Sequence, residues 1–251
     1  MATECGADQT KGVIEVGPGF GVLTRELAAR ANKMVAIELD KRLPAVLAET
    51  LRDFDNVKVV QADVMEVDLH QLIHDEFSGL DVLVCANLPY YITSPVIMKL
   101  LEEKLPVESL TVMVQKEAAV RICAAPGTRA CGAVSVAVQY YSQPQILFDV
   151  PRDCFFPAPN VDSAVIRLNI RTEPPVKLET EEKQFFKLVK AAFGQRRKTV
   201  LNSLSTGLGK SKEELSAALQ QAGIAPTARA EQLTMEQFGT LCNLLFPNKA
   251  Q

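Results

Sequence analysis

Five short apolar runs recur along the first half of the chain, and helix-like segments separate them. The runs cover residues 13–16, 34–39, 57–61, 80–86 and 110–114. Strands that alternate with helices are typical of a parallel, doubly wound sheet. Two more runs, residues 146–150 and 164–170, flank a proline-rich loop and are expected to complete the sheet as an antiparallel edge. The sequence therefore predicts an α/β fold for this part of the chain.

The last third of the chain carries a helical pattern only. After the linker at residues 172–175, apolar residues repeat at helical spacing, beginning with Phe185, Leu188, Val189 and Ala192. Ser211-x-x-Glu214 and Thr234-x-x-Gln237 are capping boxes that predict the starts of two helices, and Gly223 predicts the end of the first. The sequence thus predicts two domains, residues 1–172 and residues 173–251.

A glycine-rich loop follows the first apolar run. Gly17-Pro18-Gly19-Phe20-Gly21 lies between that run and a helical segment, so a ligand could lie against bare backbone beside a helix N-terminus. The spacing differs from the dinucleotide fingerprint G-x-G-x-x-G, because Val22 stands where its third glycine would be. It resembles instead the E-x-G-x-G-x-G loop of methyltransferases that use S-adenosylmethionine. Gly17 and Gly19 are the predicted contacts to this cofactor.

Polar residues stand at the carboxyl ends of the next three predicted strands. Glu38 could accept hydrogen bonds from both ribose hydroxyls, and Asp63 could accept one from an adenine amine. Asn87 follows at the end of the fourth strand. Either acid alone would be interpreted as a solvated loop carboxylate. Ligands of open α/β sheets bind along this edge, however, so the row of three predicts a nucleoside site.

Asn87 also opens the motif Asn87-Leu88-Pro89-Tyr90. The Asn87 side-chain oxygen and the Leu88 carbonyl can accept both hydrogens of an exocyclic amine on a base. Pro89 stiffens the backbone, and Tyr90 offers a face for stacking. We expect Phe155 to sandwich the base from the other side. The alternatives are a turn with a buried tyrosine for the motif and a core residue for Phe155.

The chain resembles a known family at several further motifs, in the right order along nearly its whole length. They are Ile37-Glu38-Leu39-Asp40, Ala62-Asp63-Val64, Gln115-Lys116-Glu117, the segment from Phe155 to Ser163, and the segment from Ala192 to Thr199. The family is that of the bacterial small-subunit rRNA adenine dimethyltransferases (KsgA/RsmA). The resemblance implies a Rossmann-like S-adenosylmethionine-binding domain followed by a small helical domain that binds rRNA. It implies dimethylation of N6 on two adjacent adenosines near the 3′ end of 16S rRNA, and a role in small-subunit biogenesis.

The chain departs from this family at its N-terminus. Members usually carry a Gly-Gln-Asn-Phe-Leu segment that closes over the cofactor, and residues 1–12 do not contain it. From the sequence we expect weak S-adenosylmethionine binding and poor methylation by the chain as given, because an open site lets water compete for polar contacts.

The charge distribution bears on RNA binding. The net charge of −3 argues against a nucleic-acid partner at first sight. Residues 183–212, however, contain eight basic residues and no acidic one, and acidic residues flank them on both sides. Such segregation favours a surface that contacts phosphates. Within it, Arg196, Arg197 and Lys198 are the predicted RNA-binding residues.

Other features exclude several classes of protein. No apolar stretch approaches the length of a membrane span, and the first residues lack the pattern of a signal peptide. The six cysteines never occur as C-x-x-C and are interpreted as reduced thiols, mostly in the core. His70 and His74 lack further ligands nearby, so no metal site is predicted. We expect a cytoplasmic monomer.

The sequence leaves three interpretations open. The first is the small-subunit rRNA adenine dimethyltransferase. The second is a large-subunit rRNA adenine N6-methyltransferase that confers antibiotic resistance, although the helical-domain signature favours the first. The third is a non-catalytic assembly factor of the same fold. A small-molecule methyltransferase would explain neither the basic segment nor the paired aromatic residues.

Overall fold

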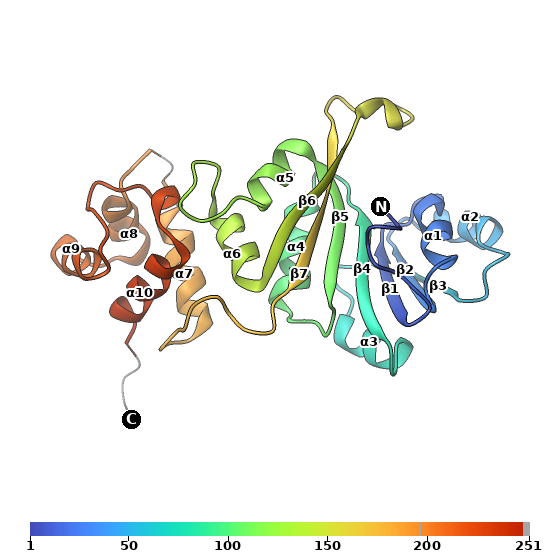
Figure 1. The fold of residues 1–251 in the computed structure, drawn as a ribbon, viewed down its shortest axis with the longest axis horizontal. Helices are drawn as coiled ribbons and strands as arrows, with labels where there is room; N and C mark the ends of the chain where they lie inside the picture. The colour runs from blue at the N-terminus through green and yellow to red at the C-terminus, as the bar shows by residue number, and fades with distance from the viewer. Residues whose placement is uncertain (196, 248–251) are drawn as a thin grey trace. The chain divides into compact units, whose positions relative to one another are not determined.

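A computed structural model describes residues 1–195 and 197–247 of the chain, and Figure 1 shows its fold. Within these residues one seven-stranded sheet has the order β3-β2-β1-β4-β5-β7-β6. The strands are β1 (Lys11–Val16), β2 (Lys33–Glu38), β3 (Val57–Gln61), β4 (Asp81–Asn87), β5 (Ser109–Gln115), β6 (Ser142–Val150) and β7 (Ser163–Ile170). β1 to β5 pair in parallel, whereas β7 pairs antiparallel with β5 and with β6. The predicted α/β sheet with an antiparallel edge is confirmed.

Helices alternate with the parallel strands and then continue alone. The first five are α1 (Val22–Ala28), α2 (Leu43–Thr50), α3 (Leu69–Glu76), α4 (Thr93–Glu102) and α5 (Lys116–Ile122). The others are α6 (Ala133–Tyr141), α7 (Glu182–Ala192), α8 (Val200–Leu208), α9 (Lys212–Gln221) and α10 (Met235–Leu245), with short 3₁₀ turns η1 (Arg152–Cys154) and η2 (Ala230–Gln232). Helices α1 to α4 each connect two successive parallel strands, as the alternating pattern predicts.

Four of the parallel strands, β1, β2, β4 and β5, are largely buried, whereas β3 at the end of the sheet has no buried residue. Val35, Val84 and Leu110, from β2, β4 and β5, are completely buried. Strands covered on both faces carry continuous apolar runs rather than an alternating pattern, which is why the runs are visible in the sequence. One apolar cluster packs Leu27 of α1 with Met34 of β2.

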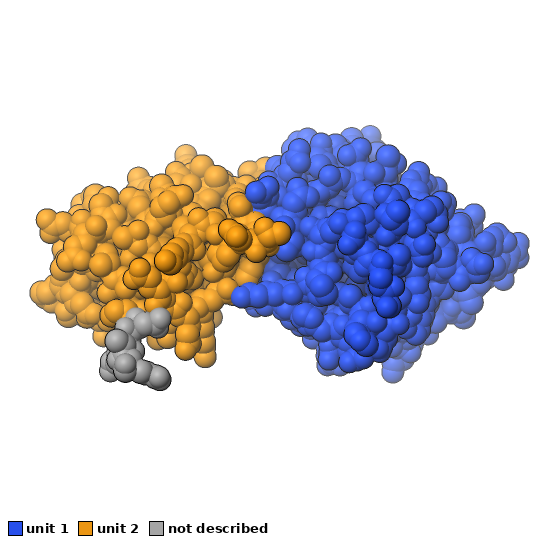
Figure 2. Space-filling model, turned by 60° about the horizontal axis from the view of Figure 1, so that its bottom comes forward, with its two compact units in different colours: residues 1–119, 142–170 blue, residues 120–141, 171–251 orange. Residues whose placement is uncertain are grey.

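The chain divides into two compact units, which Figure 2 colours separately. Unit 1 comprises residues 1–119 and 142–170, and unit 2 comprises residues 120–141 and 171–251. The second boundary falls close to the predicted linker. The sequence predicted a single boundary between the domains. In the structure the segment 120–141 also belongs to unit 2, together with the C-terminal helices. The reason is packing: Val136 and Tyr140 of α6 are buried in the same cluster as Phe185.

Unit 2 contains α6 and the helical bundle of α7 to α10, drawn from orange to red in Figure 1. The predicted apolar positions of α7 are buried: Phe185, Leu188, Val189 and Ala192. The capping box at Thr234 is complete, because Thr234 Oγ1 accepts from the Gln237 amide and Gln237 Oε1 accepts from the Thr234 amide. At Ser211 only the hydroxyl half forms, since the Glu214 carboxylate pairs with Lys210.

The described residues contain no helix that is long and apolar enough to cross a membrane. They also contain no cluster of three or more His, Cys, Asp or Glu side chains that could hold a metal ion. All six cysteines are free thiols, and four of them are buried.

Candidate active site

The polar residues that the sequence places at the carboxyl ends of the strands lie in a row along that end of the sheet. The strand order β3-β2-β1-β4 places the carboxyl ends of these strands side by side. Glu38 ends β2 and Asn87 ends β4, while Asp63 follows β3 by two residues. The glycine loop lies between them, after β1. The amide of Gly17 donates to the Ile37 carbonyl at 3.0 Å, and that of Ala62 donates to the Glu38 carbonyl at 2.9 Å, so the edge is connected by hydrogen bonds.

The glycine loop exposes its backbone to the edge. Gly17, Gly19 and Gly21 all have positive φ, at 71°, 58° and 84°. A Cβ atom at Gly17 or Gly19 would meet no atom within 4 Å, so open space adjoins the backbone there. At Gly21, by contrast, a Cβ atom would lie 3.1 Å from Thr50 Oγ1. Gly21 also caps α1 in the left-handed conformation, which other residues rarely adopt.

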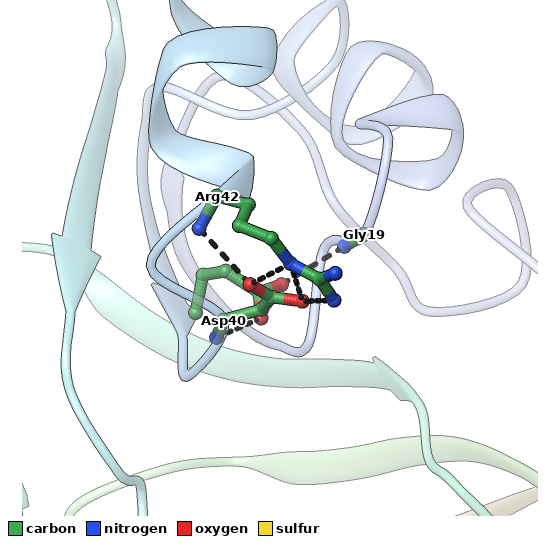
Figure 3. Close-up of polar contacts among 4 residues, drawn as sticks. Gly19, Asp40 and Arg42 are labelled. Carbon is green, nitrogen blue, oxygen red and sulfur yellow. Dashed lines mark hydrogen bonds and ion pairs between the residues drawn. The ribbon is translucent and has the colours of Figure 1, made fainter.

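Glu38 connects the glycine loop to the turn after β2, and Figure 3 draws these contacts. Its carboxylate accepts the amide of Gly19 at 3.2 Å and the amide of Asp40 at 2.8 Å. Arg42 in turn binds the Asp40 carboxylate, with Nη2 at 2.5 Å from Oδ2. The hydrogen bonds and charge of Arg42 lower the pKa of Asp40 to about 2. The Asp40 carboxylate is therefore ionised at neutral pH and available to pair with Arg42.

Asp63 lies in a turn of its own beyond β3. Its Oδ1 accepts the amide of Met65 at 2.8 Å, and its carbonyl accepts the amides of Glu66 and Val67. Val64 beside it is buried, and the side chain of Met65 is exposed. An acid with apolar residues next to it in the chain fits the predicted adenine contact, which stays a prediction.

Next to the glycine loop lies a buried carboxyl, that of Glu15, for which the sequence predicted no role. Glu15 is the second-last residue of β1, is 1% exposed, and its Oε2 has no hydrogen-bond partner among the described residues. Burial raises the pKa of Glu15 to about 7, and the Glu38 carboxylate adds to the rise while Thr24 offsets part of it. The motif E-x-G-x-G-x-G contains this glutamate, but only the fold shows that it is desolvated.

We expect this carboxyl to make stability depend on pH. An unfolded glutamate ionises near pH 4.5, whereas the folded Glu15 stays protonated until about pH 7, so folding loses stability as pH rises through this window. Between pH 6 and pH 8 the loss is about 1.4 kcal/mol. Glu15→Gln should remove this loss in urea denaturation, and exposed Glu66→Gln serves as the control. Parallel pH curves for wild type and Glu15→Gln would contradict the assignment.

The Asn87-Leu88-Pro89-Tyr90 loop is held at three points. The Leu88 amide donates to the Met113 carbonyl at 3.3 Å, and the Pro89 carbonyl accepts the Ile92 amide at 3.1 Å. The hydroxyl of Tyr90 lies 2.9 Å from Ser163 Oγ. Leu88 is buried, while the side chains of Asn87 and Tyr90 are exposed. A rigid loop thus presents an amide and an aromatic ring beside the glycine loop.

The predicted partner of Tyr90 lies in the loop between β6 and β7. Phe155 follows η1 and is half-buried, and no ring contact joins it to Tyr90 in the described structure. Its role as the second face of a sandwich stays a prediction. Phe156 in this loop and Ser163 at the start of β7 received no individual role from the sequence. Phe156 is fully exposed, and Ser163 is fully buried against the Tyr90 hydroxyl.

The basic residues of unit 2 are mostly exposed. Arg197 and Lys198 lie exposed between α7 and α8, whereas Arg196 falls outside the described residues. Three more exposed lysines repeat at i, i+4 and i+7 along α7, opposite its buried face: Lys183, Lys187 and Lys190. Lys210, at the end of the basic segment, pairs with Glu214, which lies just beyond it.

Comparison with known proteins identifies similar chains. Residues 4–246 match the family model described as ribosomal RNA adenine dimethylase. The chain is 52% identical over 240 residues to the ribosomal RNA small subunit methyltransferase A of Geobacillus thermodenitrificans (strain NG80-2), covering 94% of this chain and 82% of that protein. The protein of the same name from Alkaliphilus metalliredigens (strain QYMF) is 54% identical over 230 residues, or 91% of this chain and 80% of that one.

Two solved structures share the fold. The 23S rRNA methyltransferase ErmE is 28% identical with a TM-score of 0.69, covering 97% of this chain and 94% of that one. A dimethyladenosine transferase from Plasmodium falciparum has a TM-score of 0.75 at 24% identity, covering 94% of this chain and 90% of that one. The sheet followed by C-terminal helices is therefore a fold known from solved structures.

Proposed function

The chain belongs to the ribosomal RNA adenine dimethylase family, and on that premise we propose how its site works. It transfers methyl groups from S-adenosylmethionine to N6 of two adjacent adenosines near the 3′ end of 16S rRNA, and it acts in small-subunit biogenesis. One observation carries the assignment to this site. The rigid Asn87–Tyr90 loop and the open glycine loop stand on neighbouring strands, β4 and β1, of one sheet edge.

The residues at this edge fit S-adenosylmethionine. Open space beside Gly17 and Gly19 leaves room for the methionine part against bare backbone. The Glu38 carboxylate, already held by two amides, has remaining lone pairs for ribose hydroxyls. Asp63 supplies an acceptor for the adenine amine. When bound, S-adenosylmethionine supplies an electrophilic methyl group.

Asn87 and Leu88 prepare the target amine for attack. The N6 lone pair of adenine is delocalised into the ring, so the amine is a poor nucleophile. Acceptance of its two hydrogens by the Asn87 side-chain oxygen and the Leu88 carbonyl favours a pyramidal nitrogen with a localised lone pair. Positioning then contributes much of the acceleration. The target base must leave its stack to reach this loop, where Tyr90 offers a stacking face.

The exposed basic residues of unit 2 bind RNA phosphates in this proposal. We expect Arg197→Ala with Lys198→Ala to weaken RNA binding and to flatten its salt dependence by about 0.7–0.9 log units for each phosphate that the variant no longer neutralises. S-adenosylmethionine affinity should not change. Replacement of Arg30 and Arg52, which form ion pairs in unit 1, removes the same charge and is the control. A salt slope equal to that of the control would assign Arg197 and Lys198 to an ordinary solvated surface.

Methyl transfer to undermethylated small subunits tests the proposed function. The protein is incubated with labelled S-adenosylmethionine and such subunits, and the nucleosides of the RNA are separated. Dimethyladenosine in the small-subunit RNA is the expected product. Label in large-subunit RNA instead would favour the alternative target. The identities argue against that target, because the chain is 52% identical to a small-subunit methyltransferase and 28% identical to the 23S rRNA methyltransferase. No label at all would favour a non-catalytic assembly factor.

Two further properties belong to the proposal. Because the substrate is a ribosomal subunit, the enzyme works in the cytoplasm, where subunits are assembled. It works as a monomer, and sedimentation of the purified protein checks this.

A further inference from the structure

We propose that Ser163 is a positioning residue: its hydroxyl holds the ring of Tyr90, and this tether controls whether a second methyl group is added. The inference rests on the proposed function and extends it to the choice between monomethyl and dimethyl products. It starts from the distance of 2.9 Å between Tyr90 Oη and Ser163 Oγ. The two residues are 73 positions apart and connect the Asn87–Tyr90 loop to the strand after the Phe155 loop.

Ser163 is a rigid anchor. It is completely buried as the first residue of β7, and its backbone lies in register between Gln115 of β5 and Val150 of β6. The preceding residue is fixed too, since the carbonyl of Asp162 accepts the Lys116 amide at 3.0 Å and its Oδ1 accepts the Arg152 amide at 3.0 Å. The hydroxyl of Ser163 therefore has little freedom to move.

Tyr90 is held at both ends while its ring stays accessible. Its backbone sits in a loop whose neighbours, Leu88 and Pro89, form hydrogen bonds through their main chains. Its hydroxyl is held by Ser163, yet the residue is 37% exposed. Adjacent Tyr91, by contrast, is 83% exposed. An exposed aromatic side chain ordinarily samples several rotamers, so the hydrogen bond to Ser163 is what keeps this ring in one orientation.

The need for a fixed ring differs between the two transfers. In each transfer the N6–C bond forms as the C–S bond breaks, sulfur leaves with the electron pair as a neutral thioether, and the nitrogen loses one proton to water. The unmodified amine has two hydrogens for Asn87 Oδ1 and the Leu88 carbonyl. The monomethylated amine has one, so one of the two acceptors is left without a donor. Stacking must then supply a larger share of the positioning in the second transfer.

The test removes the hydrogen bond from either side. Ser163→Ala, Tyr90→Phe and the double variant are each incubated with undermethylated small subunits, and monomethyl- and dimethyladenosine are quantified over time. We expect the second transfer to slow about 2- to 10-fold relative to the first in each single variant, the range for loss of one hydrogen bond. Monomethyladenosine should accumulate. The double variant should equal the single variants, because both remove the same interaction.

Controls separate positioning from folding. Ser109→Ala removes another buried serine of the same sheet, at the opposite end of β5 from Gln115, and should leave the product ratio unchanged. Ser163→Thr, which keeps the hydroxyl, should restore dimethylation. An unchanged product ratio in Ser163→Ala, or additive effects in the double variant, would overturn the inference. These results are distinct from failure of the proposed function, in which the wild-type protein itself would give no methyladenosine.

Discussion

Asn87→Ala is expected to reduce methyl transfer by about 30- to 1,000-fold while RNA binding survives. In the proposed mechanism the Asn87 oxygen acts on the amine during the reaction, and removal of one preorganised hydrogen-bonding group of this kind costs about 2–4 kcal/mol of transition-state stabilisation. The phosphate contacts, in contrast, are proposed for unit 2, so the Asn87 variant should keep them. Single-turnover methylation and a filter-binding titration on the same RNA measure the two effects.

A matched control exists in the same sheet. Asn169 is also an exposed asparagine, but it lies near the far end of β7, in register with Ser109. Asn169→Ala should methylate like the wild type. Turnover of Asn87→Ala at the wild-type rate would refute the role of the amide and leave the loop with a stacking function only.

Glu38→Ala is expected to weaken S-adenosylmethionine binding by roughly 100-fold, or about 3 kcal/mol. Two effects add in this variant. In the proposed site the ribose hydroxyls lose a charged acceptor. The amides of Gly19 and Asp40 also lose the carboxylate that holds the glycine loop beside the turn. Calorimetric titration with S-adenosylmethionine measures the change.

Glu38→Gln distinguishes the two effects. Glutamine keeps an acceptor oxygen but not the charge, so its affinity should fall between those of the wild type and the alanine variant. Exposed Glu49, which pairs with Arg52 on the surface of unit 1, provides the control as Glu49→Ala. A dissociation constant for Glu38→Ala within about twofold of the wild type would place the ribose elsewhere.

Most strands and helices, and the row of polar residues at the strand ends, were predictable from the sequence. Continuous apolar runs such as residues 34–39 predict buried parallel strands because helices cover both faces of such a sheet. A parallel sheet also fixes which ends of its strands meet. The positions of Glu38 and Asn87 at strand ends were therefore enough to place both on one edge.

Local helix signals were as informative. Thr234 and Gln237 form the predicted capping box, because every hydrogen bond in it lies within four residues. The similar pattern at Ser211 formed only in part. In a complete capping box the Glu214 carboxylate would accept the Ser211 amide. It pairs with Lys210 instead, and the sequence did not indicate which of these two interactions would form.

Contacts between residues that are far apart in the chain were not predictable from the sequence and became visible in the structure. The apolar face of α6 could cover either unit, and only packing of Val136 and Tyr140 with Phe185 assigned it to unit 2. The pKa of Glu15 is raised because residues of other elements pack around its carboxyl and bury it. Tyr90 meets Ser163 across 73 residues because β7 inserts between β5 and β6, and no local pattern encodes that order. Sequence periodicity indicates which face of an element is buried. Which distant residues pack against that face depends on the packing of the whole fold.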